Sequence, residues 1–92
     1  MLKIKYTNKF KKDLKRALRR GYPEKKLEWV VTALAKEERL PVKCRDHLLE
    51  NSRGYENVRE CHISPDWLLV YRIEKDLQIL RLVRTGTHSD LF

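Results

Sequence analysis

The chain has 92 residues, which is enough for one domain (residues 1–92) with a modest core. Folding of such a domain buries roughly 60% of the surface that the unfolded chain exposes. Its 21 lysines and arginines outnumber 13 acidic residues, and this net charge of +8 predicts a polyanionic partner. Two cysteines without metal-binding spacing suggest neither a disulfide framework nor a structural zinc site, and no apolar run is long enough to span a bilayer. We therefore expect a reduced, cytoplasmic chain without a cofactor.

The positive charge is concentrated at the start of the chain. Residues 1–26 hold eight lysines and three arginines against two acidic residues, a net charge of +9, whereas the remaining residues sum to −1. The basic surface is therefore expected to be local.

A strand is predicted over residues 2–6, because Leu2, Ile4 and Tyr6 alternate with lysines.

An amphipathic helix should follow, which Thr7 or Asn8 can cap and Gly21 can end. Its apolar stripe consists of Phe10, Leu14, Ala17 and Leu18. Five basic residues remain on its outer surface, where we expect them to contact RNA: Lys11, Lys12, Lys15, Arg16 and Arg19.

A second helix is expected from Pro23, which suits a first helical turn, to a point before Pro41. Its buried stripe consists of Leu27, Val30, Val31 and Leu34. Residues 41–54 have no sustained period and contain Pro, Asn, Ser and Gly, so a long loop is expected there with His47 inside it.

Three strands are predicted over residues 55–63, 67–73 and 77–83, with a tight turn between the last two. The middle one is apolar on both faces, which indicates a central strand. Thr87 and Asp90 fit a capping box that starts a final helical turn. Together these elements predict an α+β fold in which an N-terminal strand and a helical hairpin pack on a mostly antiparallel four-stranded sheet. The face without helices is where we expect a ligand.

Residues with useful chemistry gather at the ends of the last strands. His62 and Asp66 flank a turn at Pro65, and Arg84 and His88 flank a glycine turn, so pairing of the strands can bring all four to one rim. An imidazole at position 88 can give a proton to a leaving oxygen, and the guanidinium at position 84 matches phosphate oxygens. These groups point to a phosphodiester of RNA.

Other interpretations of these residues remain open. Each one alone is common in turns and surface ion pairs, and three histidines with Asp66 could hold a metal, although their spacing is a weak zinc signature. Tyr55 and Phe92 could stack on unpaired bases, whereas core positions are expected for Trp67 and Tyr71. A basic RNA-binding module without catalysis and an interaction protein are the alternative functions.

Four segments resemble the YafQ branch of the RelE superfamily of bacterial toxins: residues 43–48, 54–55, 62–71 and 84–92. The H-x-x-P-D-W motif together with the R-T-G-T-H ending is fairly specific. Residues 1–40 match in pattern more than in identity. The resemblance implies a RelE-like fold and a type II toxin that cleaves mRNA on the ribosome as an endoribonuclease without a metal.

The resemblance also implies the site, the reaction and the partners. The active site carries over to His47, His62, Asp66, Arg84, His88 and Phe92. A ribose 2′-hydroxyl attacks the adjacent phosphate while the arginine stabilises the charge and the last histidine protonates the departing oxygen; Asp66, His62 and His47 remain alternatives for the base. The partners are mRNA in the ribosomal A site and a DinJ-like antitoxin whose acidic segment wraps the basic surface, and the free toxin is a monomer.

Overall fold

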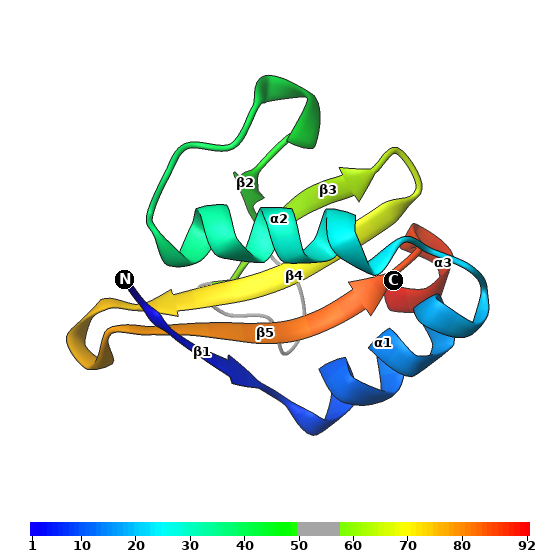
Figure 1. The fold of residues 1–92 in the computed structure, drawn as a ribbon, viewed down its shortest axis with the longest axis horizontal. Coiled ribbons are helices and arrows are strands. Elements are labelled where there is room, and N and C mark those ends of the chain that lie inside the picture. The colour runs from blue at the N-terminus through cyan, green and yellow to red at the C-terminus, as the bar shows by residue number, and fades with distance from the viewer. Residues whose placement is uncertain (50–57) are drawn as a thin grey trace.

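The structure, a computed structural model, describes residues 1–49 and 58–92. Figure 1 shows its helices and strands. In chain order they are β1 (Lys3–Tyr6), α1 (Asn8–Arg19), α2 (Glu24–Ala35), the 3-10 turn η1 (Val42–Cys44), β2 (His47–Leu48), β3 (Arg59–Ser64), β4 (Trp67–Glu74), the 3-10 turn η2 (Lys75–Leu77), β5 (Ile79–Gly86) and α3 (His88–Leu91).

The strands form one sheet in the order β1-β5-β4-β3-β2. β1 runs parallel to β5, and the other neighbouring strands pair antiparallel. The predicted α+β class and the central place of β4 are confirmed. The fifth strand was missed: β2 lies in the segment expected to be a loop, where His47 pairs with Glu60 and Leu48 pairs with Arg59. Two residues are too few to show a strand period.

Local signals fix the helix boundaries. The Thr7 hydroxyl accepts a hydrogen bond from the Phe10 N–H at 3.0 Å, which confirms the predicted cap of α1. Gly21 follows the helix with φ +89°, a left-handed conformation that glycine adopts without strain. Pro23 is the N-cap of α2 and not part of its first turn, because its backbone is extended.

The apolar residues form two clusters, one on each face of the sheet. The larger lies under α1 and α2 and includes Trp67 and Tyr71, which are 0% and 1% exposed, so their predicted core positions are confirmed. The smaller consists of Val58, Leu68, Val70 and Leu91. The expectation of a face free of helices is wrong, because Leu91 brings α3 onto it.

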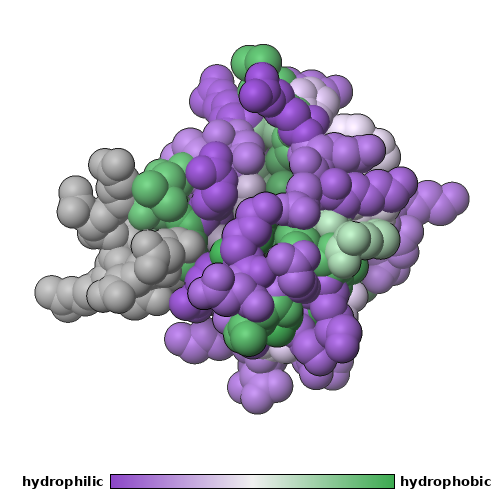
Figure 2. All heavy atoms as spheres, turned by 90° about the vertical axis from the view of Figure 1, so that its left-hand side faces the viewer, coloured by the Kyte–Doolittle hydropathy of each residue, from purple (hydrophilic) through white to green (hydrophobic). Residues whose placement is uncertain are grey.

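The surface seen in Figure 2, which is the left-hand side of Figure 1, is mainly hydrophilic. Hydrophilic side chains cover most of this side, and the hydrophobic ones form separate patches. Within the described residues, no helix combines the length and the apolar composition needed to cross a membrane.

Candidate active site

The strand register brings the candidate residues to one end of the sheet. His62 of β3 lies opposite Leu68 of β4, and Leu68 lies opposite Gly86 of β5. The turn before Trp67 and the segment leading into α3 therefore share one rim, as the sequence predicts. Figure 1 shows the β3–β4 turn, the end of β5 and α3 at this end of the sheet.

A second row of opposed residues lies two residues further into the sheet. It runs from His47 through Glu60 and Val70 to Arg84. Directly opposed residues point to the same face, so His47 is expected on the face of Val70 and the smaller apolar cluster, whereas Arg84 contacts Asp13 of α1. Three strand spacings separate the backbones of His47 and Arg84 by about 14 Å, so one small group cannot touch both residues at once.

Arg84 is held by a carboxylate. Its Nε and Nη2 donate to the two oxygens of Asp13 at 2.6 and 3.0 Å, and the Thr85 N–H donates to the same carboxylate at 3.2 Å. Asp13 is buried in α1, and the Arg84 side chain is 19% exposed. Asp13 uses two of the five N–H donors of the guanidinium and fixes its plane.

A bulge in β5 sets the position of Arg84. Val70 pairs with Arg84 whereas Tyr71 pairs with Leu82, so Val83 has no opposed residue in β4. Such a bulge bends the strand and redirects the side chains beside it. No local sequence signal marks this bulge, although Asp13 stands out as an acidic residue inside the apolar stripe of α1.

Ion pairs attach α3, which carries His88, to α1. Thr87 and Asp90 form the predicted capping box, and Asp90 also accepts from Arg20 at 2.7 Å and pairs with Arg16 at 3.3 Å. The hydrogen bond from Arg20, helped by the Thr87 backbone, holds the pKa of Asp90 well below its usual range. The carboxylate stays charged and keeps α3 in place.

His88 and Phe92 lie against each other on α3. Their ring centroids are 5.2 Å apart with the planes tilted by 44°, and the Phe92 N–H donates to the His88 carbonyl at 2.9 Å. Phe92 is 48% exposed, as its terminal position predicts. An imidazole and a half-exposed phenyl ring therefore stand together at the exit of β5.

The two other histidines are oriented by carbonyl groups. Nδ1 of His47 lies 2.6 Å from the Arg45 carbonyl, and Nδ1 of His62 lies 3.2 Å from the Pro65 carbonyl. Since a carbonyl only accepts, Nδ1 carries the proton in both rings, and Nε2 of the neutral ring is the basic atom.

A buried acid that the sequence analysis did not single out lies beside His47. Glu60 has an oxygen 3.6 Å from His47 Nε2, and its side chain is 8% exposed. Asp46, next in sequence to His47, accepts from the Tyr71 hydroxyl at 2.5 Å and from Arg59. Burial, followed by this hydrogen bond, raises the pKa of Tyr71. These contacts hold β2 against β3.

The remaining predicted residues are at the surface. Asp66 is exposed in the β3–β4 turn, and Tyr55 lies outside the described residues. The five basic residues assigned to RNA, Lys11, Lys12, Lys15, Arg16 and Arg19, are all exposed on α1. Arg16 differs from the others because it pairs with Asp90. Across residues 1–49 and 58–92, no group of three or more His, Cys, Asp or Glu side chains could hold a metal ion.

The family profile described as "Bacterial toxin of type II toxin-antitoxin system, YafQ" matches residues 2–92. A protein of Escherichia coli (strain B / BL21-DE3) named "mRNA interferase toxin YafQ" is 41% identical over 91 residues, which cover 97% of this chain and 94% of that protein.

Solved structures share the whole fold. The structure described as a metal-bound toxin from Helicobacter pylori is 48% identical, with a TM-score of 0.92 and 100% of both chains covered. The structure described as the E. coli DinJ-YafQ complex is 35% identical, with a TM-score of 0.88, and the match covers 100% of this chain and 99% of that one.

Proposed function

The chain belongs to the family of YafQ toxins of bacterial type II toxin–antitoxin systems, and from this premise we propose that it is an mRNA interferase that cuts mRNA on the ribosome without a metal ion. The proposal rests on the strand register, which puts the His62 turn and the segment leading to His88 at one end of the sheet, with Arg84 two residues further in. Because the proposed substrate is mRNA on the ribosome, we also propose that the toxin is cytoplasmic.

The proposed reaction is an internal transfer at phosphorus. The ribose 2′-oxygen forms a bond to the adjacent phosphorus while a base takes its proton, and the bond from phosphorus to the 5′-oxygen of the next nucleotide breaks. His88 gives a proton to that leaving oxygen, and Arg84 stabilises the charge on the phosphoryl oxygens. The products are a 2′,3′-cyclic phosphate and a 5′-hydroxyl end.

The base is assigned to Asp66, with His62 and His47 as supporting groups. Asp66 is exposed at the rim, and His62 directs its basic Nε2 away from the Pro65 carbonyl. His47 lies one row further in, beside Glu60, which suits a role in positioning RNA. Phe92 beside His88 provides a surface on which a base of the substrate can stack.

The ends of the cleaved RNA test this reaction. We expect cleavage of mRNA on programmed ribosomes to continue after chelation of divalent ions from the toxin, and to leave a 2′,3′-cyclic or 3′-phosphate. Enzymatic end typing distinguishes these products from a 3′-hydroxyl. A 3′-hydroxyl product, or activity lost with EDTA and restored by zinc, would refute the mechanism in favour of metal-assisted hydrolysis. Binding of RNA without any cleavage would instead favour the non-catalytic module.

We propose that the outer surface of α1 binds ribosomal RNA and a DinJ-like antitoxin with an acidic segment. We also propose that the toxin is a monomer when no antitoxin is bound. Lys11→Glu with Lys15→Glu changes the charge by four units on one face of α1 and leaves the Arg16–Asp90 pair intact. We expect weaker ribosome binding and a lower salt dependence, with the logarithmic slope reduced by about two. Pelleting with ribosomes across a salt series measures both.

The matched control is Lys3→Glu with Lys5→Glu on exposed positions of β1, which changes the net charge equally. Thermal unfolding should be nearly unchanged in both variants. Equal losses of binding in the two variants would mean that net charge, and not the surface of α1, governs docking.

A further inference from the structure

A groove between α2, η1 and β3 extends from His62 to residues that have no role in the reaction described above. It consists of two neighbouring hollows that share Lys26, Lys43, Cys44 and Ile63. Lys25, Trp29 and Val30 of α2 complete the first hollow, whose volume is about 290 Å³. We refer to these lining residues together as the Trp29 groove.

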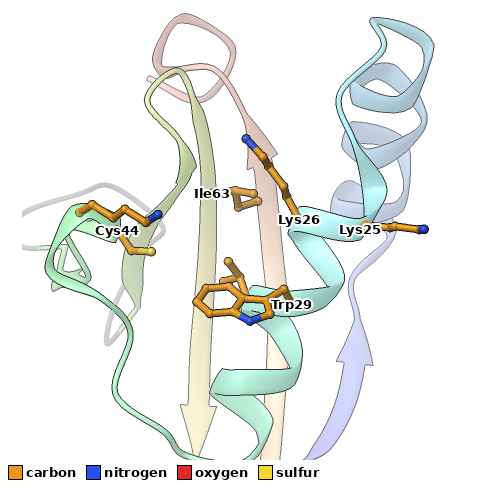
Figure 3. Close-up of a pocket in the computed structure, with 7 residues that line it drawn as sticks. Lys25, Lys26, Trp29, Cys44 and Ile63 are labelled. Carbon is orange, nitrogen blue, oxygen red and sulfur yellow. The ribbon is translucent and has the colours of Figure 1, made fainter.

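The groove combines an exposed indole with positive charge. Trp29 is 55% exposed, which is unusual for the largest apolar side chain on a helix whose other face is buried. Figure 3 shows Trp29 and Lys26 extending from α2 toward the space beside β3, whereas Lys25, at the edge of the lining, directs its ammonium group the other way. Among the described residues, neither hollow has an acidic side chain in its lining.

The second hollow leads to the candidate active site. It is lined by His62, Ser64 and Pro65 in addition to the shared residues. β2 pairs only with Arg59 and Glu60, so the end of β3 that carries His62 has no strand of the described residues on its outer side. A chain that leaves the rim at His62 can therefore continue along the groove toward Trp29.

We propose that the Trp29 groove binds a nucleotide of single-stranded RNA that flanks the cleaved bond, with its base stacked on the indole of Trp29 and its phosphates beside Lys26 and Lys43. The proposal rests on the proposed function, because it extends the RNA path from the rim. An aromatic face next to lysines is the usual means of binding unpaired nucleotides.

The lining favours RNA over an acidic peptide. Carboxylates could pair with the lysines, but they would leave the indole and the apolar floor of Val30 and Ile63 in water. A nucleobase covers an apolar floor and an aromatic face at the same time, while its phosphate stays within reach of an ammonium group.

The two tryptophans make a direct test possible. Trp67 is fully buried, so an oligonucleotide in the groove can quench only Trp29 by contact. The probe is a fully 2′-O-methylated oligoribonucleotide, which cannot supply a nucleophile and is not cleaved. We expect it to quench the red-shifted part of the tryptophan fluorescence, and we expect no such quenching in Trp29→Phe.

Affinity measured by anisotropy of the labelled probe gives the energetic effect. Trp29→Leu should weaken binding by about 5- to 150-fold, the range expected for loss of one stacked base, while Trp29→Phe should recover part of the loss. Lys26→Ala and Lys43→Ala should each lower the salt slope by about 0.7. The matched control is Leu77→Ala, an exposed apolar residue of η2 outside the groove, which should bind like the parent.

Three outcomes would overturn the inference. They are unchanged affinity in Trp29→Leu, equal quenching by a polyglutamate peptide, and equal quenching by a polyphosphate without bases. The proposed function fails only if the parent protein itself leaves ribosome-bound mRNA uncut, so this failure can be distinguished from failure of the groove proposal. A parent that cuts mRNA while Trp29→Leu binds the probe normally would refute only the groove.

Discussion

His88→Ala is expected to lower the rate of mRNA cleavage by about 10² to 10⁴, the usual effect of losing a general acid. The leaving 5′-oxygen would have to depart without a proton, while substrate contacts made by other residues would persist. The fold should persist too, because the capping box of α3 uses Thr87 and Asp90 and leaves the imidazole out. Single-turnover cleavage on programmed ribosomes measures the rate.

A control in the same helical turn separates chemistry from structure. Ser89→Ala changes the neighbouring residue of α3 and should cleave at the parental rate, and both variants should unfold at the parental temperature. Ribosome pelleting should show unchanged docking. Parental cleavage by His88→Ala would place the acid elsewhere, and loss of folding would show that the histidine is structural.

Signals carried by neighbouring residues predicted much of this fold. A cap and the residue it serves lie three positions apart, so the Thr7 cap of α1 and the Thr87–Asp90 box of α3 could be predicted directly. The five apolar residues that begin β4 likewise predicted a central strand, because only a strand buried on both faces needs them.

Contacts between distant residues could not be predicted in the same way. Asp13 and Arg84 are 71 positions apart, and their pairing depends on the bulge at Val83. Glu60 meets His47 because a two-residue strand pairs there, and so short a strand carries no period. The shared rim was predictable from the turns, whereas the groups that hold its side chains depend on register, which a single sequence leaves open.

Because Arg84 forms a buried ion pair, its substitution affects the stability of the fold as well as catalysis. Arg84→Ala leaves the Asp13 carboxylate buried without its guanidinium, and breaking such a pair costs about 3–5 kcal/mol in the free energy of unfolding. Asp13→Ala should have a comparable cost. Either loss should lower the unfolding temperature by more than about 10 °C, since 1 kcal/mol corresponds to roughly 4–8 °C in a domain of this size. Calorimetry measures both variants.

A double substitution shows whether the pair acts as a unit. Asp13→Asn with Arg84→Gln replaces the charges with groups that can still form hydrogen bonds, so it should be more stable than either single alanine variant. The coupling would be contradicted if the double variant lost as much free energy of unfolding as the two single alanine variants together. This variant should fold and yet remain inactive, because no guanidinium faces the phosphate.

Arg84→Lys then isolates the contribution of geometry to catalysis. It keeps the positive charge beside Asp13 but replaces the planar fork with a single ammonium group, which can contact one phosphoryl oxygen or the carboxylate but cannot hold a fixed plane between them. We therefore expect a folded protein whose cleavage rate falls by about 10² or more, as when a preorganised donor is lost. Parental cleavage by this variant would mean that Asp13 and Arg84 serve the fold alone, and that the charge at phosphorus is stabilised by another cation at the rim.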